Sequence, residues 1–559
     1  MYYAIRKESS VRCEPHPISG IVYRELEGGL VELRDDERAR RGVFRWDGTW
    51  VDGDLTDADI HFLRYIGGPN LPEGTDIYGP MLPVAGQGSL GAQQMGGAGS
   101  IDGEAGSEMP KLVGKYILDP GVMTEQGMRS AGHMDLGFFL DNDRKPELVP
   151  EVYRLESPMP GGPMRVDTDR FVDQRYHELE VERLWKKVWQ MACREDDIPN
   201  VGDYYIYDIA HLSYIVVRTG EKEFKAHLNV CLHRGRILRE RSGKNAIEFR
   251  CRFHGWSWKI DGSLKGITCE WDFPNVREDA KQLTAAKVGT WGGFVFINPD
   301  VNAQPLEEFL GPVMIAHYEK FNFGGKYKHA HVSRKMFGNW KVVMEAFLEA
   351  YHTIATHPQI MLMAGDGANL RYDVFGNWAR ASHVSPLYIS PQRGMLPSKE
   401  DVLKGYRAAA DLNKRFLRTI IGDEVEKFSD AELNDGNFCD VFPNLHPWSG
   451  WGRIVFRFRP YGDKVNECLM DVILLGPWPV GKPKPPAVQE RRLAPEQSWC
   501  DAPEIGNLAR IIDQDCDNVA QVQGGLKAKS PGHVWYSAYQ ESKIRHFHEL
   551  YDKWVGRPE

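Results

Sequence analysis

Two Cys–His pairs lie close together in the chain, and their side chains could hold a metal. Cys231 and His233 are two residues apart, and Cys251 and His254 are three apart. Thiolate and imidazole are soft ligands, so two short loops that each present one sulfur and one nitrogen form a four-ligand site. Zinc is one interpretation, although zinc fingers usually place both cysteines first. The alternating order instead suits a two-iron cluster in which one iron takes the cysteines and the other takes the histidines.

The residues around these ligands resemble the two cluster loops of Rieske proteins. The first loop reads Asn229-Val-Cys-Leu-His-Arg-Gly235, and the second reads Cys251-Arg-Phe-His-Gly-Trp256. The second loop of the family commonly reads Cys-Pro-Tyr-His-Gly, so this chain lacks the proline and the tyrosine hydroxyl, which bear on loop rigidity and reduction potential. Short aromatic and β-branched segments flank both loops and predict strands. We therefore expect a small antiparallel-β Rieske domain with one 2Fe-2S cluster.

A second candidate metal site follows in the segment 339–358, NWKVVMEAFLEAYHTIATHP. Large apolar residues recur there at helical spacing and predict a helix, with Glu345, Glu349 and His352 in one polar row. His357 comes just before a proline, which stops any helix, so the two histidines could meet at one ion. Taken alone, such a set is often a hydrogen-bonded polar patch without a metal.

The same segment resembles the mononuclear iron motif of Rieske oxygenases, Asp/Glu-x-Tyr-His-x₄-His. Here the motif is Glu349-Ala-Tyr-His352 followed by His357, and Ala346 stands where the family commonly has Asn. The resemblance implies that His352 and His357 bind a mononuclear non-haem Fe(II). It also implies that Glu349 holds His352 and accepts a hydrogen bond from the cluster ligand His254 of a neighbouring subunit.

A two-histidine iron site needs a carboxylate as its third ligand. The segment 507–526 offers Asp513, Asp515 and Asp517. An apolar stripe at alternating three- and four-residue spacing predicts a helix there; the stripe consists of Leu508, Ile512, Val519, Val522 and Leu526. Asp515 fills the gap in this stripe, and an inward carboxylate is costly unless it is paired or metal-bound. The family's carboxylate also precedes a Val-Gln-x-Gly run, here at 522–525. We predict Asp515 as the ligand, with Asp513 and Asp517 solvated.

Composition excludes several other functions. The chain has 559 residues and a net charge of −9, which argues against a nucleic-acid partner. No apolar run is long enough to span a bilayer, and the N-terminus lacks the apolar core of a signal peptide. Nine cysteines at irregular spacing argue against a disulfide framework. We expect a cytoplasmic protein with reduced thiols and without a membrane or nucleic-acid partner.

We divide the chain into three parts. Residues 1–165 form an N-terminal extension of unassigned role, in which the Gly-rich stretch 86–106 predicts a flexible linker. A formal G-x-G-x-x-G at 86–91 is interpreted as a chance match, because prolines instead of a strand precede it. Residues 166–298 are the Rieske domain, and 299–559 are the catalytic domain. The family resemblance implies that the catalytic domain is a helix-grip fold, an antiparallel sheet around a long helix, so the fold class is α+β.

The resemblance covers about residues 165–559 and indicates the terminal oxygenase (alpha) subunit of a Rieske non-haem iron aromatic-ring-hydroxylating system. Such an enzyme uses O2 and electrons from a ferredoxin, an NAD(P)H-dependent reductase, or both. It is typically a homotrimer, with or without a β subunit. The alternative is a Rieske electron-transfer protein without oxygenase activity. Intact His352, His357 and Asp515 favour the enzyme.

The substrate is predicted only by class. The family acts on aromatic, polycyclic and steroid-like compounds, by dihydroxylation, monohydroxylation or demethylation. Residues 360–475 are rich in Met, Phe and Trp, which suits a bulky apolar ligand, although the same residue types also form ordinary cores.

Overall fold

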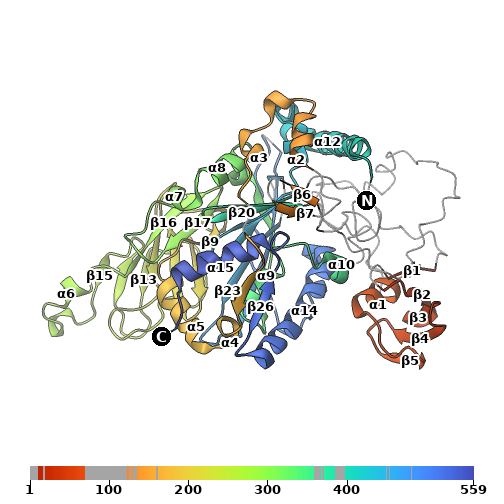
Figure 1. Ribbon diagram of the computed structural model, residues 1–559. Coiled ribbons are helices and arrows are strands. Elements are labelled where there is room, and N and C mark those ends of the chain that lie inside the picture. Colours follow the sequence, from red (N-terminus) through yellow and green to blue (C-terminus); the bar gives the residue numbers. More distant parts are fainter. Residues whose placement is uncertain are drawn as a thin grey trace.

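The computed structural model in Figure 1 extends over the chain with several gaps. It describes residues 11–16, 19–68, 122–124, 127–129, 135–158, 161–357, 367, 370–383, 397–448, 450–451, 454–479 and 481–558. The Gly-rich stretch 86–106 lies outside these residues. In the described part, no helix is both long and apolar enough to cross a membrane.

Residues near the N-terminus form a small folded unit, which we call the N-terminal unit (11–68). Five antiparallel strands follow one another in chain order, and a helix packs on them. Their bounds are β1 Cys13–Pro15, β2 Val22–Leu26, β3 Leu30–Asp35, β4 Arg40–Arg45, β5 Trp50–Gly53 and α1 Ile60–Gly67. Asp59 caps α1 by accepting a hydrogen bond from the backbone N–H of Phe62. The unit has its own core, made of Tyr23, Val31, Leu33, Phe44, Phe62, Leu63 and Ile66.

The Rieske part contains two antiparallel sheets. A six-stranded sheet has the order β10-β11-β12-β16-β17-β9, and a three-stranded sheet has the order β13-β14-β15. Their bounds are β9 Gln190–Arg194, β10 Tyr204–Ile209, β11 Leu212–Arg218, β12 Phe224–Leu228, β13 Glu248–Arg250, β14 Ser257–Lys259, β15 Leu264–Gly266, β16 Ala285–Trp291 and β17 Phe294–Asn298. Neighbouring strands pair antiparallel in both sheets, so the antiparallel-β prediction is confirmed. Apolar residues from both sheets also fill one core.

The catalytic part is built on an eight-stranded sheet. Its order is β19-β20-β21-β22-β23-β24-β18-β25, and only the β18–β25 pair is parallel. The bounds are β18 Tyr327–Met336, β19 Leu370–Phe375, β20 Trp378–His383, β21 Phe438–Val441, β22 Leu445–Pro447, β23 Ile454–Pro460, β24 Cys468–Gly476 and β25 Arg491–Leu493. Every residue of the adjacent strands β23 and β24 is buried, so this part of the sheet is covered on both faces and supports the helices that pack on it.

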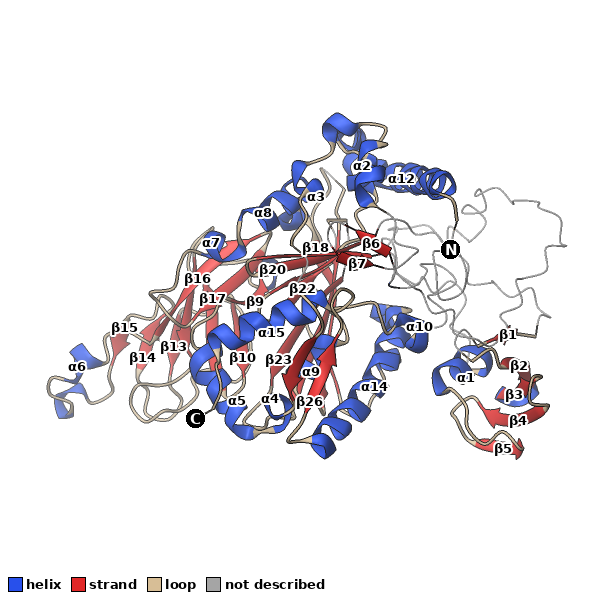
Figure 2. Ribbon diagram, viewed as in Figure 1, coloured by secondary structure: helices blue, strands red, loops and turns tan. Residues whose placement is uncertain are grey.

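Several helices cover this sheet and position the candidate iron ligands. Figure 2 shows α9 and α15 in front of its strands. The covering elements are α9 Trp340–Glu345, α10 Thr353–Thr356, α14 Leu508–Lys529 and α15 Ser542–Trp554, with the strand pair β8 Met164–Asp167 and β26 His533–Tyr536 beside them. Helix α9 packs against both β23 and α14, which brings the histidine segment next to the late carboxylate helix.

The other strands and α-helices connect or flank these elements, and some of them, such as α4, contribute to the main core. They are β6 Val122–Thr124, β7 Gly127–Arg129, α2 Leu136–Asp141, α3 Glu151–Arg154, α4 Asp169–Val172, α5 Gln174–Glu180, α6 Val276–Asp279, α7 Leu306–Leu310, α8 Pro312–Tyr318, α12 Lys399–Ile421 and α13 Asp430–Leu433.

Two details of the helix predictions are wrong. The predicted helix does not continue to Tyr351, because α9 ends at Glu345 and the chain turns before α10 begins. The side chain of Glu349 accepts the backbone N–H of His352 and so replaces a helical hydrogen bond. In α14, Val522 is 49% exposed, because the last turns of that helix extend past the core and only Leu526 is buried there.

Candidate metal centres

The two cluster loops have the same backbone hydrogen bonds. The N–H of Cys231 donates to the carbonyl of Arg236 (2.8 Å), and the N–H of Cys251 donates to that of Trp256 (2.8 Å). A glycine N–H closes each loop onto the cysteine carbonyl at 3.0 Å. In the second loop this is Gly255, where φ is +80° and an added Cβ would lie 2.6 Å from the hydroxyl oxygen of Thr268. The loops therefore present their ligands in equivalent positions.

The four predicted cluster ligands come together at the loop tips. Cys231 and Cys251 are buried, and the rings of His233 and His254 lie 4.6 Å apart between centroids. The Nδ1 atoms of both histidines are buried and have no hydrogen-bond partner among the described residues. Trp256 stacks on His233 and fixes its ring plane. Buried nitrogens without partners are costly, so two thiols and two free imidazole nitrogens fit a Rieske cluster.

Phe253 occupies the position where the family has tyrosine. The centroid of its ring lies 3.8 Å from that of His254, and the guanidinium carbon of Arg234 lies 5.3 Å from the Phe253 ring centroid. Because Phe253 is 56% exposed, it covers His254 with an apolar surface that faces solvent in the single chain. Phe253 thus contacts His254 through its ring and, unlike a tyrosine at this position, has no hydroxyl with which to form a hydrogen bond.

The three predicted iron ligands converge although they come from two distant segments. The Nε2 atom of His357 lies 2.8 Å from an Asp515 carboxylate oxygen, and the Nε2 atom of His352 lies 3.3 Å from the same oxygen. The two Nε2 atoms are 3.2 Å apart. His357 and Asp515 are buried and His352 is partly buried. Two imidazoles and one carboxylate on one side of a small space are the donor set of a non-haem iron site.

Outer partners fix which ring nitrogen faces the centre. The Nδ1–H of His352 donates to Glu349 at 2.6 Å, and the Nδ1–H of His357 donates to the side-chain oxygen of Gln514 at 3.0 Å. Each acceptor leaves the Nε2 lone pair directed at the shared site. Glu349 was predicted from the motif. Gln514 was missed, and its only signal in the sequence is its place beside Asp515 on the buried side of α14.

The electrostatics of the site favour a charged carboxylate. Burial alone would raise the pKa of Asp515, but His357 and His352 outweigh it and lower the pKa to about 2. For His352, burial would lower the pKa, yet Glu349 and Asp515 raise it well above its usual value. A cation between these groups is therefore stabilised by the carboxylates around it.

The other two acids of α14 have separate roles. Asp517 is half-exposed and forms an ion pair with Arg64 of the N-terminal unit, so it lies away from the metal ligands, as predicted. Asp513 is mostly buried, which contradicts the prediction that it is solvated. Its carboxylate accepts hydrogen bonds from the Ser498 hydroxyl and from the backbone N–H of Trp499, so it anchors the chain that precedes the helix.

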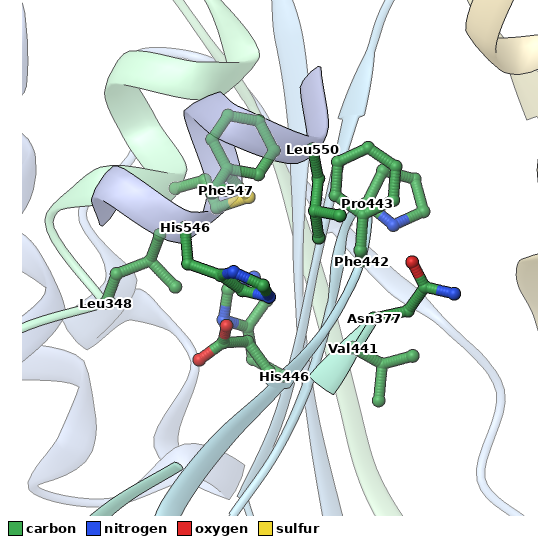
Figure 3. A pocket seen from close by; sticks show the side chains of 11 residues that line it. Leu348, Asn377, Val441, Phe442, Pro443, His446, His546, Phe547 and Leu550 are labelled. Atoms are coloured by element: carbon green, nitrogen blue, oxygen red, sulfur yellow. The ribbon is translucent and has the colours of Figure 1, made fainter. Parts of the chain in front are cut away.

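An apolar pocket lies beneath the segment that leads to Glu349 (Figure 3). It lies between α9, α15 and the strands β21 and β22, and His446 points into it. The surrounding side chains are mostly apolar; they include Met344, Leu348, Val441, Phe442, Phe547 and Leu550. Both ring nitrogens of His446 are buried without a hydrogen-bond partner among the described residues. The pocket is small, with a free volume of about 10 Å³, and its lining also includes the polar side chains of His546, Asn377 and Asp440.

Comparison with known proteins supports two domains in the predicted order. Residues 188–277 match the Rieske [2Fe-2S] domain, and residues 325–557 match the catalytic domain of the ring hydroxylating alpha subunit. The presence of the second domain rules out the interpretation as an electron-transfer protein alone.

Individual relatives agree with these domain matches. The large oxygenase component of salicylate 5-hydroxylase from Ralstonia sp. is 29% identical over 336 residues, 55% of this chain and 70% of that protein. Biphenyl dioxygenase subunit alpha from Paraburkholderia xenovorans is 31% identical over 314 residues, 51% of this chain and 67% of that protein.

A solved structure shows the same fold. A naphthalene 1,2-dioxygenase variant bound to phenanthrene superposes with a TM-score of 0.51 at 18% identity, covering 72% of this chain and 94% of that one. The chain therefore belongs to the family of Rieske non-haem iron oxygenase alpha subunits, which carry a Rieske 2Fe-2S cluster and a mononuclear iron, use O2 and receive electrons from ferredoxin or reductase partners.

Proposed function

We propose that this chain is the terminal oxygenase component of a multicomponent system that inserts oxygen from O2 into a hydrophobic aromatic, polycyclic or steroid-like substrate. The observation that carries this proposal is the convergence of His352, His357 and Asp515, whose ligand atoms all lie within 4.8 Å of one another. An electron carrier has no need of such a buried site, since an uncompensated inward carboxylate destabilises a protein.

Each metal group has a proposed set of ligands. Cys231, His233, Cys251 and His254 would hold the cluster, and His352, His357 and Asp515 would hold the iron. When bound, the cluster supplies single electrons, and the iron supplies open coordination positions at which O2 is activated.

The surrounding residues prepare this site without taking part in bond formation. Glu349 and Gln514 hold the protons on the Nδ1 atoms of the two histidines, so that both Nε2 lone pairs face inward. Burial of Asp515 and His357 excludes bulk water from the side of the site that faces α14.

Electron transfer is proposed to cross a subunit boundary in a homotrimer. Figure 1 shows the cluster end of the chain, near β13 and β15, far from α10 and α14. We propose that His254 of one subunit meets Glu349 of the next, as the family resemblance implies. Two exposed aromatic side chains support this contact, because exposed rings are suited to burial against a neighbouring subunit. Phe253 lies beside His254, and Tyr351, which is 54% exposed, lies beside His352. A ferredoxin or reductase partner and a cytoplasmic location complete the proposal, which holds with or without a β subunit.

The substrate class is inferred from the relatives. Those reported above are named for salicylate, biphenyl and naphthalene, all of which are aromatic. Dihydroxylation, monohydroxylation and demethylation all remain within the proposal, because the same ligand set serves each of them.

The test is the metal content of anaerobically purified protein together with the EPR spectrum after dithionite reduction. Wild type is expected to contain about three irons and about two acid-labile sulfides per chain, with a Rieske-type signal. Asp515→Ala should lose the mononuclear iron and keep the sulfide and the signal, whereas Gln521→Ala, an exposed change on the same helix, should lose neither. Full iron content in Asp515→Ala would show that the ligand assignment is wrong.

A further inference from the structure

The N-terminal unit lies against the helix that carries Asp515, although it belongs to neither matched domain. Arg64 at the end of α1 forms an ion pair with Asp517 of α14. Two turns earlier on α14, the guanidinium of Arg510 donates to the backbone carbonyl of Arg64 at 2.6 Å. Two contacts of this kind, one to a side chain and one to the backbone, fix both the position and the direction of α1 on α14.

A third contact continues from this interface toward the candidate iron ligands. The Nε2–H of His61 donates to the side-chain oxygen of Asn518 (3.4 Å), and the amide of Asn518 donates to the hydroxyl of Thr356 (3.0 Å). Both His61 and Thr356 are buried, and Thr356 is the residue immediately before His357. The chain of contacts thus runs from the N-terminal unit through α14 to the backbone next to a ligand.

The geometry of α14 explains why this chain matters for the metal site. Position 518 is three residues from 515 and four residues from 514, so Asn518 lies on the same side of the helix as both of these residues. That face presents Gln514 to His357, Asp515 to both histidines and Asn518 to Thr356. A small rotation of α14 would displace all three contacts together.

We propose that the N-terminal unit is a clamp on α14, in which His61, Asn518 and Thr356 act as positioning residues for His357 and Asp515. The proposal rests on the iron site proposed above and adds a role for a part of the chain that neither family model covers. The unit is suited to this task because it has its own apolar core and a capped helix, so it can hold α14 without ordering itself on contact.

The expected effect is a loss of metal affinity without loss of the fold. Removing a direct hydrogen-bond partner of a metal ligand typically costs 10–100-fold in affinity, so groups one step further out should cost about three- to tenfold. His61→Ala, Asn518→Ala and Thr356→Val should each weaken binding by this factor. Thr356→Ser keeps the hydroxyl and should restore the wild-type value. Asp36→Asn, which removes an exposed pair with Arg34 on the same unit, should have no effect.

The experiment uses the full chain after chelation of the mononuclear iron, with Co(II) as the probe and a competing fluorescent chelator to measure its dissociation constant. Hydrogen exchange of peptides covering 353–357 and 508–520 is the second readout, and the Rieske EPR signal reports that the fold is retained. Weaker Co(II) binding and faster exchange in His61→Ala and Thr356→Val, with recovery in Thr356→Ser, would support the clamp.

Wild-type affinity and wild-type exchange in His61→Ala and Thr356→Val would overturn it. Failure of the iron-site proposal has a different signature, namely Co(II) binding to the wild type that does not change in Asp515→Ala. In that case hydrogen exchange alone decides on the clamp, since faster exchange at 353–357 in His61→Ala supports it and unchanged exchange refutes it.

Discussion

At the scale of single residues, His446 is a buried polar group without a hydrogen-bond partner among the described residues, in the small pocket that Leu348 also lines. Burial and the nearby Lys543 lower its pKa well below the usual histidine value, so the ring is neutral. Neither ring nitrogen has a partner among the described residues, and the ring packs edge-on against Phe458. A buried imidazole without hydrogen bonds destabilises the fold, and such a cost is typical of residues kept for function.

Replacement of His446 by leucine should therefore stabilise the protein. Leucine has a similar volume and no polar atom, so His446→Leu is expected to raise the free energy of unfolding by about 1–2 kcal/mol. His446→Ala, which also removes the polar ring but leaves a cavity, should instead lower it. Thermal unfolding of both variants beside wild type checks this. A lower melting temperature for His446→Leu would mean that the ring is satisfied by an internal water, and the functional argument would fail.

At the scale of elements, a buried carboxyl joins α9 to α15 and β26. Glu345, the last residue of α9, accepts hydrogen bonds from the Tyr536 hydroxyl at 2.7 Å and from the His548 Nε2–H at 2.9 Å. Arg170 donates to the Nδ1 atom of the same histidine, so the ring proton must be on Nε2. Burial raises the pKa of Glu345 from 4.5 to about 7, although Tyr536, Lys341 and Arg170 oppose this rise.

This carboxyl should make stability depend on pH. Between pH 4.5 and about 7 the unfolded chain releases the proton of Glu345 while the folded protein keeps it, so its contribution to stability falls as pH rises through this window. The full difference is about 3 kcal/mol. Glu345→Gln keeps a neutral side chain and should be the more stable protein at pH ~8 but not at pH ~4.5. Melting temperatures across this range test it, and a constant difference between the two proteins would contradict it.

The same elements show what could and could not be predicted from the sequence. Short aromatic and β-branched segments predicted the strands of the Rieske part, and the apolar stripe predicted α14 with Asp515 turned inward, because both patterns are local. The end of α9 at Glu345 was not predictable, because the apolar spacing continues to Tyr351, whereas the N–H groups of Phe347 and Leu348 donate to carbonyls three residues back instead of four. The roles of Gln514 and of the N-terminal unit depend on contacts between distant segments, which no local pattern records.

At the scale of the whole molecule, one buried carboxylate links the catalytic and Rieske parts. Asp471 of β24 accepts hydrogen bonds from the guanidinium groups of Arg457 and Arg459 and from His331. His331, Asp471 and Glu490 lie close enough to hold a cation. Because two guanidinium groups already neutralise Asp471, this cluster is better explained as an ion-pair network than as a metal site.

The two arginines extend this network into the Rieske sheet. Arg457 donates to the carbonyls of Met191 (3.2 Å) and Ala192 (2.6 Å) in β9, and Arg459 donates to that of Asp208 (2.7 Å) in β10. Asp471 therefore orients both guanidinium groups toward backbone acceptors of the neighbouring part.

Neutralising the Asp471 carboxylate should lower the stability of the catalytic part and of the Rieske part together. Asp471→Asn leaves two buried arginines poorly compensated and is expected to cost about 3–5 kcal/mol of stability. The matched control is Asp463→Asn. Asp463 forms an exposed pair with His211 of the Rieske part, and its replacement should cost at most about 1 kcal/mol of stability.

Denaturant unfolding followed by cluster absorption and by tryptophan fluorescence measures both parts at once. We expect Asp471→Asn to shift both transitions to lower denaturant, because the network spans the boundary between them. A shift in the fluorescence transition alone would show that the Rieske part is held by other contacts.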